Sequence, residues 1–123
     1  MDKSELVKRT RFFAKGVFKL ERLPKGQASA VITYQLMKSS SSVAANYRAV
    51  IRAKSTLDFK NKIKIVLEEA DESNFWLTFI ADVELLEIDD KELVSLIKES
   101  SELTAIFTAT LKTLNLKSNI NKS

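Results

Sequence analysis

Apolar residues recur at three- and four-residue intervals along almost the whole chain, a spacing that predicts helices rather than strands. Four such segments are separated by short stretches that carry turn or capping signals. Their expected bounds are 4–22, 27–54, 56–87 and 90–116, and residues 117–123 are expected to form a disordered tail. Short connections favour antiparallel neighbours. The sequence therefore predicts one all-α domain over 1–116, an up-down-up-down antiparallel four-helix bundle.

The same spacing predicts which side chains face the core. In the second helix the apolar stripe continues only if Ser39 or Ser40 fills one core turn, so the serine run 39–42 is interpreted as helix and not as a linker. Gly16, in the middle of the first helix, costs about 1 kcal/mol relative to Ala and suggests close packing there. The predicted core residues are Leu6, Phe13, Val17, Leu20, Ile32, Leu36, Val43, Tyr47, Val50, Phe59, Ile63, Val66, Ala70, Leu77, Ile80, Leu93, Leu96, Ile97, Leu103, Phe107, Leu111 and Leu114, with Trp76, Phe79, Val83 and Leu86 widening the buried face of the third helix.

Three candidate N-caps precede predicted helices: Ser4, Ser55 and Asp89. An acid follows three residues after each of the last two, Asp58 and Glu92, which resembles a capping box.

A hairpin between the second and third helices would turn at 54–55 and place Ser39 and Ser40 opposite Glu72 and Asp71. Mutual satisfaction of these polar groups is the expected outcome.

Composition removes most catalytic chemistry. The chain has no Cys and no His, which excludes disulfides, thiolate zinc sites and the commonest general acid and base. Two glycines are too few for a glycine-rich phosphate loop. We therefore expect a protein that is not an enzyme and needs no cofactor. Glu68 and Glu72, one helical turn apart, leave an all-oxygen Mg²⁺ or Mn²⁺ site as a minor alternative. No apolar run approaches a membrane span and the N-terminal residues lack a signal-peptide core, so a cytoplasmic location without membrane contact is expected.

The charge is divided unevenly along the chain. Residues 1–64 hold 15 Lys/Arg against 4 Asp/Glu, a formal charge of +11. Residues 65–123 hold 5 Lys/Arg against 12 Asp/Glu, a formal charge of −7, so that the whole chain carries +4. This division fits an anionic partner for the basic half, head-to-tail self-association, or neutralisation within one bundle.

A basic stripe runs along the first predicted helix, on an arc of about 80° opposite the core residues. Clustered Lys and Arg suffice for binding a phosphate backbone without sequence preference. Phe12 lies between the basic and apolar arcs, as a bundle-edge residue or an exposed contact. Trp76 and Phe79 are expected in the core rather than as a base-stacking platform, with Phe75 outward. The candidate nucleic-acid-binding residues, together called the basic surface, are Lys8, Arg11, Lys15, Lys19, Arg22, Arg48, Arg52, Lys54, Lys60, Lys62 and Lys64.

Four stretches resemble one family. They are FAKGVFKLERLPK (13–25), SVAANYRA (42–49), EEADESNFWL (68–77) and ESSELTAIF (99–107). The most specific pieces are the Ala-Asn-Tyr of the second stretch and, in the third, the Trp-Leu with the Glu-Ser that precedes it. The chain resembles the four-helix-bundle proteins encoded in bacterial 23S rRNA intervening sequences. The matching positions, implied to be framework or subunit-interface residues, are Asn46, Tyr47, Glu68, Glu72, Trp76, Leu77, Glu99 and Leu103.

The resemblance implies a homopentameric ring of up-down bundles. The accessory proteins of diversity-generating retroelements are similar in fold and partner a reverse transcriptase and nucleic acid. Where the family often has an acid just after its Asn-Tyr, this chain has Arg48 and Ala49, which makes the surface more basic. We therefore expect a homo-oligomeric nucleic-acid-binding or ribonucleoprotein accessory protein, acting on RNA or DNA without sequence specificity. The alternative is a protein–protein adaptor ring with no direct nucleic-acid role.

Overall fold

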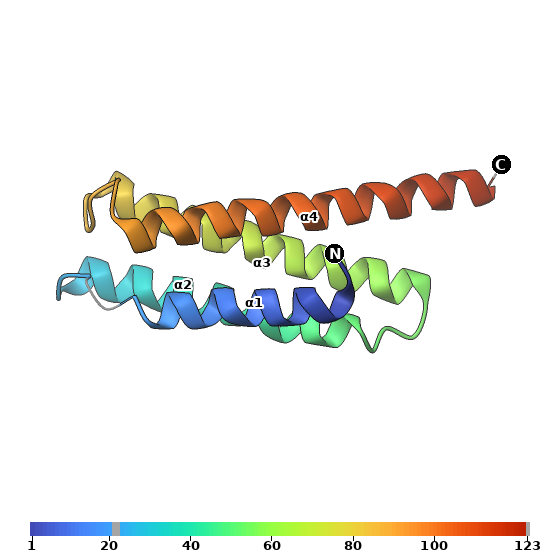
Figure 1. The fold of residues 1–123 in the computed structure, drawn as a ribbon, viewed down its shortest axis with the longest axis horizontal. Coiled ribbons are helices and arrows are strands. Elements are labelled where there is room, and N and C mark those ends of the chain that lie inside the picture. Colours follow the sequence, from blue (N-terminus) through green and yellow to red (C-terminus); the bar gives the residue numbers. More distant parts are fainter. Residues whose placement is uncertain (21–22, 123) are drawn as a thin grey trace.

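The computed structural model describes residues 1–20 and 23–122, with side chains up to residue 117. Four helices form this part of the chain: α1 (Lys3–Phe18), α2 (Gln27–Val50), α3 (Thr56–Asp82) and α4 (Lys91–Lys122). Each runs antiparallel to the one before it, with α1 and α2 in one layer and α3 and α4 in the other (Figure 1). Consecutive helices pack extensively, whereas α1 and α4 touch much less. The predicted all-α four-helix bundle is confirmed.

The core lies where the apolar spacing predicts it. Every predicted core residue is buried or half-buried except Val83, which is 43% exposed because α3 ends at Asp82 and Val83 lies past its last helical residue. Within the core, the ring centroids of Tyr47 and Phe107 lie 5.6 Å apart. Gly16 packs closely as expected, because a Cβ atom at this position would lie 3.0 Å from Leu96 Cδ2.

The serine run is helical and inward-facing at Ser39 and Ser40, which are fully buried. The Ser73 hydroxyl donates to Ser39 Oγ over 3.0 Å, which sets the α2–α3 register within one residue of the predicted one. The carboxylates of Asp71 and Glu72 point to solvent and do not satisfy the serines, so that expectation is wrong. Ser39 donates instead to the carbonyl of Leu36 in its own helix, a bond that serine hydroxyls commonly make one turn back along a helix.

Two predicted caps are displaced. Asp2, not Ser4, caps α1 by accepting from the Glu5 N–H over 2.8 Å, and Asp2 has the acid three residues later that Ser4 lacks. At the start of α4, Asp90 rather than Asp89 accepts, from the Leu93 N–H over 3.0 Å. A cap must precede the first helical residue directly, and a choice between adjacent acids depends on backbone angles that the sequence does not specify.

The first three helices end before their predicted bounds. Beyond α3, Glu84 adopts a left-handed conformation with φ of 59°, and the Leu85 N–H donates to the Ile80 carbonyl over 3.0 Å. This is a Schellman motif built on a residue other than glycine, so the usual sequence signal is missing. By contrast, α4 continues to Lys122, through the stretch predicted as a tail. The sequence contains no glycine or proline after 116 that would stop it.

Candidate nucleic-acid interface

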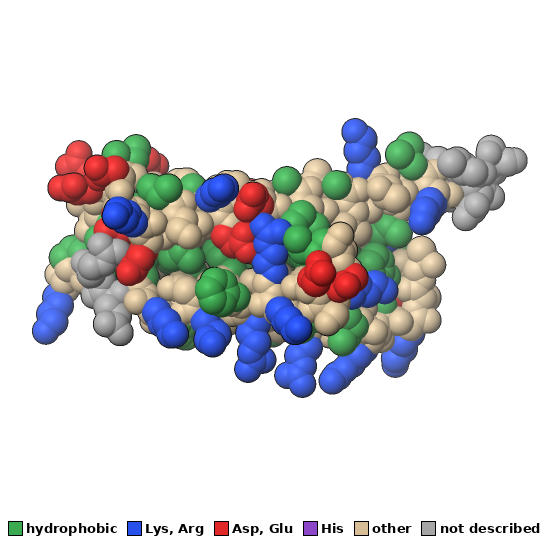
Figure 2. Space-filling view, viewed as in Figure 1, with side chains coloured by type: hydrophobic (Ala, Val, Ile, Leu, Met, Phe, Trp, Pro, Cys, Tyr) green, Lys and Arg blue, Asp and Glu red, His purple; other side chains and the backbone are tan. Residues whose placement is uncertain are grey.

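The outer face of α1 carries the first part of the basic surface. Lys8, Arg11, Lys15 and Lys19 are all exposed, while Phe13 and the other core residues of α1 face inward. At 1.5 Å per residue, the stripe from Lys8 to Lys19 extends about 16 Å. Figure 2 shows Lys and Arg side chains following one another along the edge below α1 and α2, and Asp and Glu gathered where α3 connects to α4.

The second part of the basic surface lies around the α2–α3 connection. This connection sits at the end of the bundle where α1 begins (Figure 1), and there Lys3 Nζ lies 4.8 Å from the Phe59 ring centroid. Lys60 is half-buried, and Arg22 lies outside the described residues. The exposed members of this second part are Arg48, Arg52, Lys54 and Lys64.

Lys62, a member of the basic surface, is engaged within the chain. Its ammonium contacts Asp58 Oδ1 over 2.6 Å, one turn earlier in α3. Asp58 also accepts from the Lys54 N–H over 2.9 Å, and its own N–H donates to the Ser55 cap over 3.0 Å. The hydrogen bond from Lys62, followed by that from Lys54, lowers the pKa of the Asp58 carboxyl. Lys62 therefore stabilises the start of α3.

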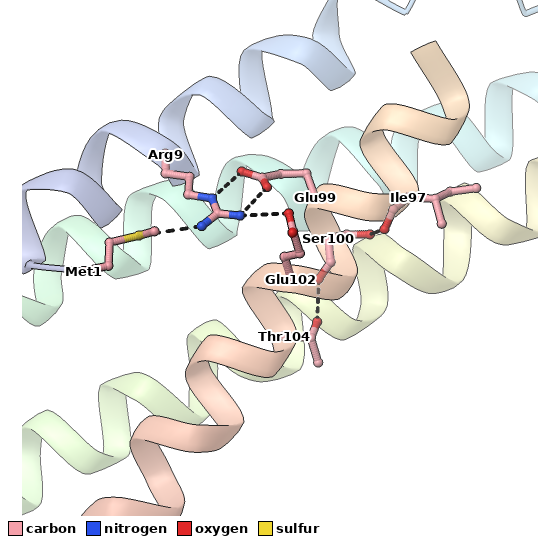
Figure 3. Close-up of polar contacts among 7 residues, drawn as sticks. All are labelled: Met1, Arg9, Ile97, Glu99, Ser100, Glu102 and Thr104. Carbon is pink, nitrogen blue, oxygen red and sulfur yellow. Dashed lines mark hydrogen bonds and ion pairs between the residues drawn. The ribbon is translucent and has the colours of Figure 1, made fainter. Parts of the chain in front are cut away.

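An ion-pair cluster that sequence reasoning missed joins α1 to α4. The Arg9 guanidinium donates from Nε and Nη2 to the two oxygens of Glu99, both over 2.7 Å, and from Nη2 to Glu102 over 3.0 Å (Figure 3). The hydrogen bond to Glu99 is the main reason that the pKa of Arg9 is raised. The only sequence signal was that Arg9 falls off the basic arc while Glu99 and Glu102 share a face of α4. We call this cluster the Arg9 clamp.

A pocket of about 640 Å³ opens beside the Arg9 clamp, between α1 and α4. Gly16 and Leu96 are among its lining residues, with Phe12 and the amine-bearing side chains of Lys19 and Lys98. Figure 2 shows hydrophobic side chains exposed between these two helices. The sequence did not predict this pocket, because it needs two helices far apart in the chain to lie side by side.

The comparison with known proteins agrees with this architecture. A family model described as "23S rRNA-intervening sequence protein" matches residues 2–109, most of the chain. The chain belongs to the 23S rRNA-intervening sequence protein family. A crystal structure from the S23 ribosomal protein family of Bacteroides thetaiotaomicron, described as of unknown function, is similar at 27% identity with a TM-score of 0.79. The match covers 91% of this chain and 99% of that one. No curated protein matches the chain.

The apolar residues of the family pattern lie inside this bundle. Tyr47, Leu77 and Leu103 are buried, and burial raises the pKa of the Tyr47 hydroxyl. Asn46 donates to both the carbonyl and the hydroxyl of Ser42, over 2.9 and 2.8 Å, within α2. Burial of the first three residues and the hydrogen bonds of Asn46 within its own helix are what we expect of framework residues.

Trp76 of the family pattern belongs to an aromatic cluster on α3 with Phe75 and Phe79. Trp76 is half-buried, with ring centroids 4.9 Å from Phe75 and 6.0 Å from Phe79. Phe75 points outward as expected, with 52% of its surface exposed. The buried Trp76 indole nitrogen has no hydrogen-bond partner among the described residues.

The acidic members of the family pattern lie in different settings. Glu99 belongs to the Arg9 clamp, whereas Glu68 and Glu72 are exposed on α3. Burial, and then the charge of Glu72, raises the pKa of the neighbouring Glu69. Within the described residues, no three Asp or Glu side chains group in a way that could hold a metal ion. None of the described helices in this family member is long and apolar enough to cross a membrane.

Proposed function

We propose that this protein is a homo-oligomeric, pentameric and non-enzymatic accessory protein that binds the phosphate backbone of RNA or DNA through its basic surface. The exposed row of Lys8, Arg11, Lys15 and Lys19 along α1 is the observation that carries this proposal. A partner protein such as a reverse transcriptase would join the same ribonucleoprotein. The reaction chemistry would belong to that partner.

The geometry of the basic row fits a nucleic-acid strand. Phosphates of one duplex strand recur about every 3.4 Å of helix axis while the strand winds around it, so a row of about 16 Å is long enough to contact more than one phosphate. Cations on flexible stems contact phosphates without reading bases, which supports binding that is independent of sequence. The exposed cations around the α2–α3 connection would lengthen this contact.

An apolar groove on the surface of the bundle supports self-association. It runs between α2 and α3, is lined by Val31, Trp76, Phe79 and Val83, and has a volume of about 700 Å³. Val31 is 53% exposed and Val83 is 43% exposed. Contiguous apolar surface of this kind marks interaction sites. In a ring, this surface would be buried by a neighbouring copy through a heterologous contact.

Binding at varied salt tests the nucleic-acid proposal. We expect the affinity for a labelled RNA or DNA duplex to fall steeply with salt, with log K against log salt following about −0.9 per phosphate contacted. Replacing all four cations of the α1 row with Ala should flatten this slope by about 3 to 4 units. The matched control, Lys112→Ala with Lys117→Ala, removes exposed cations from the far end of α4 and should leave the slope unchanged. Salt-independent binding, or none at low salt, would contradict the proposal.

The apolar groove equally favours the second candidate, an adaptor ring that scaffolds a partner protein. Light scattering should give about 70 kDa for five copies of the 13.9 kDa chain. A ring of this mass that binds no nucleic acid, yet retains one stoichiometric protein partner after nuclease treatment, would support the adaptor and contradict nucleic-acid binding.

A further inference from the structure

The pocket between α1 and α4 lies directly beside the basic row. Its volume of about 640 Å³ falls within the range of roughly 300–1,000 Å³ that is typical of pockets for small ligands. Phe13, Gly16 and Leu96 contribute to its lining. Because Gly16 lacks a side chain, α1 approaches Leu96 closely at one end of the pocket without filling the space in front of it.

Phe12 stands at the edge of this pocket with 74% of its surface exposed. On the helix, its neighbours one turn away are Lys8 and Lys15 of the basic row on one side, and Gly16 and the clamped Arg9 on the other. An aromatic ring so exposed gains little for folding, because most of its apolar surface stays in water. Proteins that bind single-stranded nucleic acids combine aromatic rings, on which bases stack, with nearby cations that contact the backbone. Phe12 lies among cations in this way, with an open pocket beside it.

The charged groups of the pocket suit a nucleotide. The ammonium-bearing residues Lys19, Lys91 and Lys98 line it. The carboxylates of Glu99 and Glu102 line it too, and the single positive charge of Arg9, hydrogen-bonded to both, offsets one of their two negative charges. Glu92 also contributes to the lining.

We propose that this pocket takes one unpaired base of single-stranded RNA or DNA, stacked on Phe12, with the flanking phosphates held by Lys19 and Lys98. This inference rests on the proposed nucleic-acid binding and adds that the preferred substrate is single-stranded. In a duplex the bases are paired and stacked on each other, so none is available to Phe12. The basic row alone would bind both forms.

The test compares three ligands and two kinds of variant. The ligands are a single strand of about twelve nucleotides, the same strand with abasic sites, and a duplex of equal length. Phe12→Ala should weaken binding of the intact single strand about five- to 150-fold, given what one stacked base contributes, and change duplex and abasic binding by less than about twofold. Phe12→Trp should retain the preference for the intact strand, whereas Phe12→Leu should lose it because it has no π face.

The control is Phe75→Ala, which removes another exposed aromatic ring from α3, away from the pocket, and should leave all three affinities unchanged. Because Phe12 is exposed, its replacement should not unfold the bundle, and an unchanged melting temperature would verify this. Two results would overturn the inference alone, provided that the protein binds the duplex. One is equal affinity for the intact and abasic strands, and the other is an unchanged affinity of Phe12→Ala for the intact single strand. Absence of binding to all three ligands would overturn both the inference and the proposed function.

Discussion

Replacing Arg9 with Met tests the Arg9 clamp, because it removes the guanidinium that joins α1 to α4 and keeps an unbranched side chain. Two hydrogen bonds of 2.7 Å reach Glu99, whose side chain is 22% exposed, and Arg9 itself is 25% exposed. Paired hydrogen bonds from a guanidinium to one carboxylate are the strongest form of ion pair at a protein surface. Glu102, at 3.0 Å and 49% exposed, is bound more weakly.

The magnitude follows from this partial burial. Hydrogen bonds to charged groups contribute about 1.5–3 kcal/mol when buried, and exposed ion pairs about 0.2–1 kcal/mol. The Arg9–Glu99 coupling should lie between these cases, at about 1–2 kcal/mol, and the Arg9–Glu102 coupling at about 0.2–0.5 kcal/mol. For a domain of this length, each 1 kcal/mol lowers the melting temperature by roughly 3–5 °C.

A double-mutant cycle with Arg9→Met and Glu99→Gln measures the coupling by chemical denaturation. The control cycle pairs Arg11→Met with Glu99→Gln, since Arg11 is an exposed cation on the same helix that faces away from α4, and its coupling should be near zero. A coupling for Arg9 and Glu99 below about 0.3 kcal/mol would refute the reasoning, because two well-aligned and half-buried hydrogen bonds should contribute more.

Two further substitutions probe the packing of α1 and the start of α3. Gly16→Ala should change the free energy of unfolding by less than about 0.5 kcal/mol, because a gain in helix propensity of up to about 1 kcal/mol is offset by displacing the Leu96 methyl group. Gly16→Val should destabilise the protein by about 1–2 kcal/mol in the same denaturation assay. Asp58→Asn should lower stability at neutral pH and lose its effect in acid: the folded-state pKa of Asp58 is lowered, so its contribution is present above the ordinary pKa of about 4 and disappears as pH falls through the folded value. Thermal melts of both proteins from pH 7 to pH 2 would show this, and a difference that is constant with pH would contradict the role of the Lys62 ion pair.

The fold could be predicted from the sequence because the apolar period is nearly uninterrupted. Even the serine run was placed correctly, since the stripe before Ser39 continues in phase after it. Helix ends were predicted less well. The left-handed residue after α3 is Glu84, where a glycine would have given the signal, and Asp90 caps α4 beside an equally suitable Asp89. Such ends depend on backbone conformations that several residue types can adopt at modest cost.

The candidate site could be predicted only in part. Helical phase identifies which cations of α1 share a face, and the structure places Lys8, Arg11, Lys15 and Lys19 there. Phase alone cannot say which helix faces which. The partners of Arg9 lie 90 and 93 positions later in the chain, and the pocket beside Phe12 likewise exists only because α4 returns alongside α1.

The Arg9 clamp and the close contact at Gly16 together determine the shape of that pocket. Arg9 and Gly16 are seven residues apart, two turns of helix, and therefore lie on the same side of α1. Each brings α1 against α4, Arg9 through Glu99 and Gly16 through Leu96, and Phe12 lies between them. Because α1 and α4 pack against each other far less extensively than consecutive helices do, these two contacts contribute much of what holds the pocket walls together. In the proposed complex, Arg9 would favour a phosphate without touching it, because its charge offsets one of the two negative charges of Glu99 and Glu102.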